Sequence, residues 1–516
     1  MDRGVDTDNH ETRSMSASVT NDYDVLIIGA GVSGIDAAYY MNEHCPSHTY
    51  AILERRASLG GTWDFFKYPG IRSDSDMYTF GFSWKIWKSA KPIAPAEDIL
   101  QYLDEAAREQ GILKRIKFNI DIRWAQWSSA TQRWKLTTTT GAVYMCKMLF
   151  GCTGYYSYEK PHRPHFRGEE NFKGLIVHPQ NWTNEHDSQV AKKRVAVIGS
   201  GATAVTLIPN LAKTASHVTM VQRSPTYILA RPEEDAMTQT INNWLPEYFA
   251  VQLNRWRHII MQRLMFEYCT RYPEGAKKMI LNGMFKHLKG AISRDEFDEH
   301  FTPKYNPWEQ RLCLSPGGDF FKVFRENKGS IVTGSVKQFT NDGILMEGGN
   351  TVDADVIISA TGLNMQQNFP FSTMEVLIDG EKYIPSTKLV YKGVMLSGVP
   401  NFAFIVGYTN ASWTLKADIA SLYFTKLVNY MAKNNKGIVC PRILTGVKPS
   451  DGDIWSLKSG YVSRAGPQMP KQGNKEPWIQ YHNYFVDATK LWFGGIEDES
   501  LEFGPCIVNK GLSSRL

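Results

Sequence analysis

The feature that most constrains the fold is a strand, glycine-turn and helix pattern that occurs twice in the 516-residue chain. In the first copy, an apolar, β-branched run at residues 24–28 enters a Gly-x-Gly-x-x-Gly turn made by Gly29, Gly31 and Gly34. These glycines allow a tight turn, close approach of a pyrophosphate, and close packing of helix on strand. A second strand ends about twenty residues later in Glu54, which can accept hydrogen bonds from ribose hydroxyls. This order predicts a bound dinucleotide.

The second copy of the pattern begins with an apolar strand at Arg194. Its turn carries Ala204 in place of the third glycine, a change that the fingerprint permits. The residues expected to contact the nucleotide in this turn are Gly199, Ser200, Gly201, Ala202 and Thr203. The next strand ends in Arg223 and Ser224 rather than in an acid, and arginine can pair bidentately with a 2′-phosphate. The second site is therefore predicted to prefer NADP over NAD.

Two nucleotide folds in one chain predict hydride transfer between two cofactors, for which the usual acceptor is FAD. The fold class predicted is α/β, with two Rossmann-like dinucleotide-binding domains (FAD and NADP) and a helical insert. We expect a disordered tail at 1–20, an FAD-binding domain at 21–160 and 376–516, an NADP-binding domain at 161–231 and 301–375, and the insert at 232–300. The part at 376–516 is also expected to hold a substrate loop.

In the predicted insert, glycine is scarce and large apolar residues recur at helical spacing. They are Trp244, Tyr248, Trp256, Ile260, Leu264 and Tyr268. Such a pattern more often marks core packing than a cofactor site, so we expect these side chains to be buried, with some facing a substrate cavity.

Composition excludes several classes of protein. The net charge of +6 predicts no nucleic-acid footprint. The seven cysteines include no Cys-x-x-Cys pair, so we expect neither a metal site nor a disulfide reductase. We expect the protein in an intracellular, reducing compartment. Residues 1–20 do not resemble a signal peptide, and we expect no integral membrane segment. The C-terminal Ser514-Arg515-Leu516 resembles a peroxisomal address, with a chance tripeptide in a cytoplasmic protein as the alternative.

A loop rich in turn-forming residues follows directly after Glu54, at 60–76. It carries Trp63, Arg72, Asp74 and Asp76. A surface excursion is one interpretation. However, open α/β sheets bind ligands beyond the carboxyl ends of their strands, so this loop is also placed to wrap over a flavin ring.

Between the two fingerprints lies a segment containing Phe172, Gly174, His178 and Trp182, which by itself reads as a connector. It resembles the Phe-x-Gly-x-x-x-His-x-x-x-Trp-Pro signature of class B flavoprotein monooxygenases of the Baeyer–Villiger type, with Thr183 in place of the proline. Trp182 favours this branch over the N-hydroxylating and sulfoxidising flavin monooxygenases, and Thr183 keeps that alternative open. Similarity to the family, and most of all to its mycobacterial ethionamide-activating branch, extends to residues 60–64, 68–78, 305–314 and 407–418.

The resemblance implies which residues hold the cofactors. FAD would contact Gly29, Gly31, Gly34, Glu54, Thr62, Trp63, Asp64, Tyr68, Asp74 and Tyr78, and NADPH the second turn with Arg223 and Ser224. Many relatives carry a lysine for the 2′-phosphate where this chain has Gln310, so Arg223 carries more of the selectivity.

The resemblance also implies a reaction. NADPH reduces FAD, O₂ adds to give a C4a-peroxyflavin, and this peroxide, kept deprotonated, converts a ketone into an ester or lactone. In its protonated form it can oxidise a sulfide. Arg311 would stabilise the anion and help to place the nicotinamide, and Asp74 would orient Arg311. We do not expect His178 to transfer a proton, and we expect it to have a structural or gating role.

The substrate expected from the resemblance is a small ketone, aldehyde or thioether, including secondary-metabolite intermediates. The insert at 232–300 and a loop that resembles a mobile loop of the family, at 461–473, are expected to shape its pocket. A flavoprotein that merely leaks electrons as an NADPH oxidase, or acts as a redox-dependent binding partner, is the alternative from another class.

Overall fold

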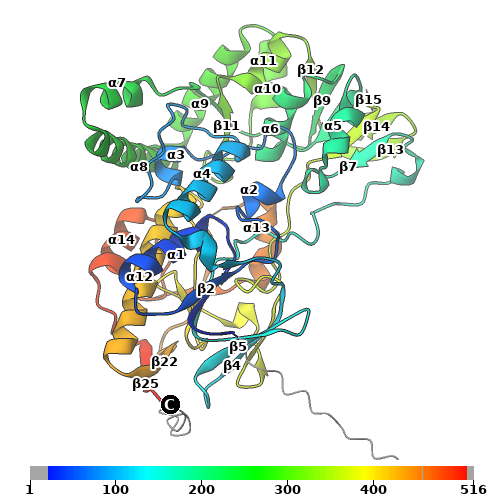
Figure 1. Cartoon of the computed structure of the whole chain (residues 1–516). Coiled ribbons are helices and arrows are strands. Elements are labelled where there is room, and N and C mark those ends of the chain that lie inside the picture. Colours follow the sequence, from blue (N-terminus) through cyan, green and yellow to red (C-terminus); the bar gives the residue numbers. More distant parts are fainter. Residues whose placement is uncertain (1–20, 456, 508–516) are drawn as a thin grey trace, which may run out of the picture.

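The computed structural model describes residues 21–455 and 457–507. The tail at 1–20 and the tripeptide Ser514-Arg515-Leu516, on which two sequence predictions rest, lie outside this range. Figure 1 shows a large unit in the lower half of the molecule, a second unit at the upper right, and a group of helices at the upper left.

The large unit is built around β1 (Asn21–Ile28), whose second half is apolar and buried and which has parallel neighbours on both sides. Its eleven-stranded sheet has the order β18-β17-β4-β5-β6-β1-β2-β3, and β21 pairs with the second half of β6. The other strands are β2 (Tyr50–Leu53), β3 (Ile116–Lys117), β4 (Ile122–Ser128), β5 (Arg133–Thr138), β6 (Val143–Gly151), β17 (Glu375–Ile378), β18 (Glu381–Lys382), β19 (Val390–Tyr391), β20 (Met395–Leu396) and β21 (Phe402–Phe404). Chain beyond residue 401 therefore completes a sheet that begins at residue 21.

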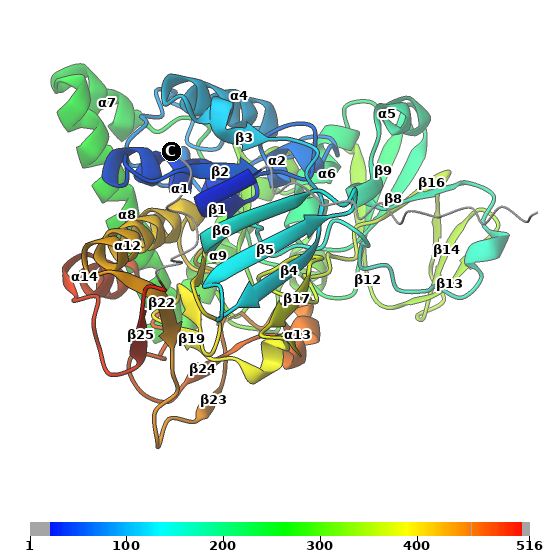
Figure 2. The same cartoon turned by 60° about the horizontal axis from the view of Figure 1, so that its bottom comes forward.

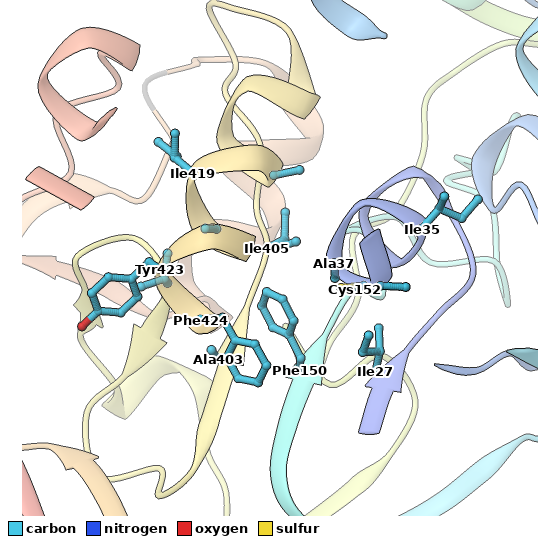
Figure 3. Packing of buried hydrophobic residues seen from close by; sticks show 14 of the residues in the cluster. Ile27, Ile35, Ala37, Phe150, Cys152, Ala403, Ile405, Ile419, Tyr423 and Phe424 are labelled. Atoms are coloured by element: carbon cyan, nitrogen blue, oxygen red, sulfur yellow. The ribbon is translucent and has the colours of Figure 1, made fainter. Parts of the chain in front are cut away.

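Helices α1 (Val32–His44), α4 (Ala96–Glu109) and α12 (Trp413–Lys433) cover this sheet. Figure 3 shows the packing of α12 beside α1, where Phe150 of β6 stacks on Phe424 of α12 with ring centroids 4.1 Å apart. The buried face of α4 includes Ile99, Leu103 and Ala107. Cys152 is buried in this cluster.

The antiparallel strands β4 and β5 carry Trp127 and Trp134, which pack into a second core. Shorter elements surround the sheet. They are α2 (Thr62–Phe65), α3 (Met77–Phe80), α13 (Gly460–Ala465), α14 (Tyr484–Phe493), the pair β22 (Lys436–Pro441) and β25 (Leu501–Pro505), the pair β23 (Pro449–Asp453) and β24 (Lys471–Gly473), and the 3₁₀ turns η1 (Ile112–Arg115), η4 (Pro385–Thr387) and η5 (Gly466–Gln468).

The second unit holds a five-stranded parallel sheet in the order β12-β9-β8-β16-β7. Its strands are β7 (Leu175–Val177), β8 (Arg194–Ile198), β9 (His217–Gln222), β12 (Gly329–Thr333) and β16 (Val356–Ser359). Around them lie η2 (Glu169–Asn171), η3 (Pro179–Asn181), α5 (Asn184–Val190), α6 (Ala202–Leu211), α11 (Asp319–Arg325), the parallel pair β10 (Ile228–Arg231) and β11 (Cys313–Pro316), and the antiparallel β13 (Val336–Thr340), β14 (Gly343–Met346) and β15 (Thr351–Asp353).

Between β10 and β11 the chain forms four helices. They are α7 (Ala236–Trp244), α8 (Glu247–Arg271), α9 (Pro273–Leu288) and α10 (Arg294–Phe301). The expectation that the large apolar residues of this region are buried is wrong: Trp244, Tyr248, Trp256, Ile260, Leu264 and Tyr268 are all exposed. The reason is that α8 turns its polar side inward, where Arg255 forms an ion pair with Asp418 of α12. Among the described residues, no helix is long and apolar enough to cross a membrane.

Candidate active site

A cleft of about 970 Å³ lies beside the carboxyl ends of β1, β2 and β6 and reaches the first turn of α6. This is the edge at which open α/β sheets bind nucleotides. The residues predicted to contact cofactor or substrate that line it are Gly29, Gly31, Glu54, Thr62, Trp63, Tyr68, Asp74, Ala202, Thr203 and Arg311. The cleft thus joins the first fingerprint, the loop 60–76 and the beginning of the second fingerprint.

The first fingerprint forms a turn in which glycines leave the backbone uncovered by side chains. Gly29 has a φ of +102°, and a Cβ there would lie 2.7 Å from the carbonyl oxygen of Cys152. A Cβ on Gly31 would reach only the backbone of Gly61, at 3.6 Å. Just beyond, α1 begins at Val32 and directs its unpaired N–H groups and the positive end of its dipole toward the turn. These residues fit the pyrophosphate of a dinucleotide.

Glu54 directly follows β2, lines the cleft and is buried. One carboxylate oxygen accepts the Ala30 N–H at 2.7 Å and the other accepts the Arg56 N–H at 2.8 Å. A carboxylate has about four acceptor positions, so Glu54 retains capacity for ribose hydroxyls while it ties the first glycine turn to the chain that follows β2.

The glycine turn of the second fingerprint is more exposed to solvent than that of the first. Gly199 has a φ of +138°, and a Cβ there would collide with the carbonyl oxygen of Ala360. Ser200 donates a hydrogen bond through Oγ to the backbone carbonyl of Ser224 at 2.9 Å, which brings the turn next to the end of β9. Arg223 is exposed beside them. A glycine turn, a helix N-terminus and an exposed arginine fit a phosphorylated nucleotide.

Loop 60–76 reaches from the large unit to the second unit through two acid–arginine pairs. Asp74 accepts a hydrogen bond from Nη1 of Arg311 at 2.7 Å, and Arg72 meets Asp319 of α11 at 2.5 Å. Arg72 also donates to the carbonyl of Leu314 at 3.3 Å. The loop therefore holds the edges of the cleft together at the point where the two units meet.

Arg311 lies on the wall of the cleft with its partner Asp74, and each side chain is about one-third exposed (31% and 34%). The negative charge of Asp74 raises the pKa of the Arg311 guanidinium still further above its ordinary value. Arg311 is thus a permanently charged cation whose direction is set by a carboxylate. This pair, expected from the resemblance, joins residues 237 positions apart in the chain.

Three tyrosines surround Arg311: Tyr155 and Tyr156, which sequence reasoning did not single out, and Tyr461 from the predicted pocket loop 461–473. Tyr155 donates a hydrogen bond to the hydroxyl of Tyr156 at 2.7 Å and stacks on Trp413, with ring centroids 5.2 Å apart. Burial raises the pKa of Tyr155 and Tyr156, so both phenols stay neutral. A signal for Tyr155 and Tyr156 was present in the sequence, because they directly follow Gly154, just after the apolar run that forms the end of β6.

Several predicted site residues do not line the cleft. Asp64 is engaged with Arg56 at 2.7 Å, and the Tyr78 hydroxyl donates to the carbonyl of Ala90 at 3.1 Å. Asp76 caps α3 by accepting the Thr79 N–H. The others outside the lining are Gly34, Gly199, Ser200, Gly201, Arg223, Ser224, Phe172, Gly174, His178 and Trp182. Gly34 lies at the close contact between α1 and Gly29, where a side chain would not fit.

The segment from Phe172 to Trp182 forms an edge of the second sheet through β7, which pairs with β16. Phe172 packs on Phe339, and a Cβ on Gly174 would collide with the Phe172 ring. Trp182 is buried and donates a hydrogen bond to Asp187 at 3.0 Å.

His178 joins this segment to the turn after β16. Its Nδ1 accepts the Gln180 N–H at 3.1 Å, so its Nε2 carries the proton and donates to the Gly362 carbonyl at 3.1 Å. Burial lowers the pKa of His178 to about 4. Five residues after His178, at the last position of the signature, Thr183 precedes α5 and donates its N–H to His186 at 2.9 Å, a bond that a proline could not make.

Comparison with known proteins identifies the family. The family model FMO-like, described as flavin-binding monooxygenase-like, matches residues 22–265. The FAD-containing monooxygenase EthA of Mycobacterium tuberculosis (strain ATCC 25618 / H37Rv) is 44% identical over 490 residues, 94% of this chain and 98% of the relative. The probable FAD-binding monooxygenase AlmA of Acinetobacter baylyi (strain ATCC 33305 / BD413 / ADP1) is 41% identical over 485 residues, 93% of this chain and 96% of the relative. These relatives are bacterial, so they lend no support to a peroxisomal address.

Solved structures show the same fold. An oxidized steroid monooxygenase bound to NADP superimposes with a TM-score of 0.72 at 19% identity, covering 94% of this chain and 100% of that one. A cyclohexanone monooxygenase from Rhodococcus sp. Phi1, bound to NADP⁺, gives 0.70 at 20% identity with the same coverage. These matches confirm the predicted α/β fold. With more than 40% identity to bacterial relatives over nearly its whole length, the chain belongs to the family of flavin-binding monooxygenases.

Proposed function

We propose that this monooxygenase uses FAD and NADPH to insert one oxygen atom of O₂ next to a carbonyl, which converts a ketone into an ester or lactone. The two electrons come from NADPH, one oxygen atom enters the product, and the other leaves as water. The observation that carries the proposal is the pair of Arg311 and Asp74, 2.7 Å apart, in a cleft that joins the two nucleotide turns.

The fixed cation favours insertion next to a carbonyl over oxidation of nitrogen or sulfur. Attack on a carbonyl carbon requires a nucleophilic, anionic oxidant, and a guanidinium at the cleft wall stabilises negative charge as it develops. Arginine keeps its proton in such a site, where lysine could lose it, and Asp74 prevents the guanidinium from swinging away. Oxidation of a thioether by the protonated oxidant is a second, weaker activity that the same site would support.

FAD would occupy the first turn, with its pyrophosphate at Gly29 and Gly31 and its ribose at Glu54, and would supply the redox centre at which O₂ reacts. NADPH would occupy the second turn, with Arg223 on its 2′-phosphate. The tyrosines beside Arg311 would exclude water from the reacting groups.

We also propose the domain division drawn from the sequence, with FAD bound by 21–160 and 376–516, NADP by 161–231 and 301–375, and an insert at 232–300. The separate sheets support it: β17, the first strand of the returning segment, begins at residue 375. The substrate would be a small ketone, aldehyde or thioether, including secondary-metabolite intermediates, in a pocket shaped partly by loop 461–473, whose Tyr461 lines the cleft.

The test is Arg311→Ala, with Asp74→Ala as the second variant and Arg311→Lys as the matched control. We expect Arg311→Ala to purify with bound flavin and to oxidise NADPH, yet to form ester at least about a hundredfold more slowly. Arg311→Lys should retain more ester formation, because it preserves a cation. Ketones, aldehydes and thioethers would be screened as substrates by mass spectrometry. Ester formation at the wild-type rate in Arg311→Ala would refute the role of Arg311, and NADPH oxidation by the wild type without any oxygenated product would favour the uncoupled oxidase.

A further inference from the structure

Two neighbouring phenols, Tyr155 and Tyr156, line the cleft near Arg311 and share a single hydrogen bond. The Tyr155 hydroxyl donates to the Tyr156 hydroxyl at 2.7 Å. Two hydroxyls carry two hydrogens, and this bond uses only one of them. Within the described residues, no group accepts the hydrogen of Tyr156. The pair therefore leaves one O–H donor available in the cleft.

The backbone that carries the two phenols is held in place by a neighbouring segment. The N–H of Gln366 donates to the Tyr155 carbonyl at 3.0 Å, and the N–H of Ser157 donates to the Asn364 carbonyl at 2.8 Å. The chain on both sides of Tyr156 is thus hydrogen-bonded to the same stretch, as in a short piece of sheet. This pairing fixes where the Tyr156 side chain begins.

Ring contacts restrict the two side chains as well. The Tyr155 ring stacks on Trp413 of α12 with centroids 5.2 Å apart, and the centroids of Tyr155 and Tyr156 are 4.0 Å apart. On another side of Tyr156, the ring of Tyr461 lies 6.2 Å away. A donor that is already oriented loses little conformational freedom when it binds an acceptor, so more of its hydrogen bond contributes to binding.

The electrostatics keep Tyr156 a neutral donor beside a cation. Burial raises the pKa of Tyr155 and Tyr156, so neither phenol gives up its proton to an anionic oxidant. The bond from Tyr155 polarises the Tyr156 hydroxyl and strengthens its donation. Arg311 uses Nη1 for Asp74, and its other N–H groups are left for the oxidant. The cleft therefore offers two different donors for two different oxygen atoms.

We propose that Tyr156 is a catalytic residue that binds the carbonyl oxygen of the ketone substrate, with Tyr155 as the positioning residue that orients its hydroxyl. This assignment rests on the proposed function. Addition of the oxidant forms a bond to the carbonyl carbon and moves the C=O electron pair onto the carbonyl oxygen. When that pair re-forms the C=O bond, one carbon substituent migrates with its electrons to the inserted oxygen, and the O–O electron pair leaves with the other oxygen atom. The phenol stabilises the charge on the carbonyl oxygen and keeps its proton throughout.

A thioether gives Tyr156 no such acceptor. Sulfur accepts hydrogen bonds only weakly, and its oxidation places no charge on a carbonyl oxygen. Tyr156 should therefore favour ester formation over sulfoxidation in the same cleft. A donor that acted on a cofactor instead would affect both reactions alike.

The experiment compares Tyr156→Phe with the wild type, each with bound FAD, on the ketone and the thioether of highest turnover in the substrate screen. We expect the rate of ester formation, and its ratio to sulfoxide formation, to fall about tenfold or more. Tyr155→Phe should lower ester formation about threefold, because it removes only the bond that orients Tyr156. The matched control is Tyr461→Phe, the same change at another phenol near Arg311, and it should lose less ester formation than Tyr156→Phe.

A second measurement does not depend on turnover. The same ketone, isotopically labelled at its carbonyl carbon, is bound to the enzyme with oxidised FAD, and its C=O stretching frequency is measured by infrared difference spectroscopy. Donation from Tyr156 weakens the C=O bond, so the frequency should be lower in the wild type than in Tyr156→Phe.

The assignment is overturned if Tyr156→Phe forms ester at the wild-type rate, or if ester and sulfoxide formation fall by the same factor. It is also overturned if the C=O frequency is equal in the two proteins, or if Tyr461→Phe loses more ester formation than Tyr156→Phe. Absence of ester from every screened ketone in the wild type would instead refute the proposed function, and the assignment with it. Ester formation by the wild type thus separates the two failures.

Discussion

Replacement of His178 by Asn tests how the connector between the two units is held. The imidazole is buried, accepts the Gln180 N–H through Nδ1 and donates from Nε2 to the Gly362 carbonyl. Both bonds require the neutral ring. In His178→Asn, the amide oxygen can still accept the Gln180 N–H, but the side chain no longer titrates and is too short to reach Gly362 in the same way.

The pH dependence follows from the direction of the pKa shift. Burial lowers the pKa of folded His178 to about 4, whereas an unfolded histidine has a value near 6.5. Above about pH 6.5 both states are neutral and the stabilisation is fully present. As the pH falls, the unfolded state binds a proton first, so stability is lost from about pH 6.5 down to about pH 4. The full loss is about 3 kcal/mol, of which about 2 kcal/mol is gone by about pH 5.

The assay is native-state hydrogen exchange of the peptide covering residues 175–182, followed by mass spectrometry between about pH 7 and pH 5 and corrected for intrinsic exchange rates. A local measurement is needed because burial also lowers the pKa of His482 to about 4, and global unfolding would combine the two. We expect protection of this peptide to fall with pH in the wild type and to stay flat in His178→Asn. Equal pH profiles for the two proteins would refute the reasoning.

Two further predictions concern the cofactors. Gly29→Ala should purify without flavin, as judged by its visible absorbance, because a Cβ would lie 2.7 Å from the Cys152 carbonyl oxygen at a φ of +102°. The matched control is Gly141→Ala, also at positive φ (+86°) but with nothing within 4 Å, and flavin bound equally by both variants would contradict the assignment of this turn to flavin. Arg223→Ala should raise the KM for NADPH about tenfold and leave that for NADH nearly unchanged in steady-state kinetics; an equal rise for both would argue against a 2′-phosphate contact.

The nucleotide turns could be predicted from the sequence because their geometry is local. Gly29 and Gly199 adopt positive φ values within a few residues of the strand that precedes them, and each turn sits directly before a helix. The contact of Thr183 is local as well: its departure from the family signature is visible in the sequence, and at the start of α5 it bonds to His186, three residues away.

The wall of the cleft depends on contacts between distant residues. The pairing of Arg311 with Asp74 was predicted only from the resemblance to the family. No local sequence pattern predicts that Tyr155 and Tyr461 lie next to them. Those neighbours come from the end of β6 and from α13, which only the return of the chain to the first sheet brings together.

Helix α8 marks the boundary between the two kinds of information. The spacing of Trp256, Ile260 and Leu264 determined that one face of this helix is apolar. Spacing alone does not decide whether that face turns inward or outward, because a helix has the same period in either orientation. The tertiary structure decided it, because Asp418, Asp235 and Asp76 lie on the protein side, where Arg255 and His258 pair with them. The apolar face is left to solvent for that electrostatic reason.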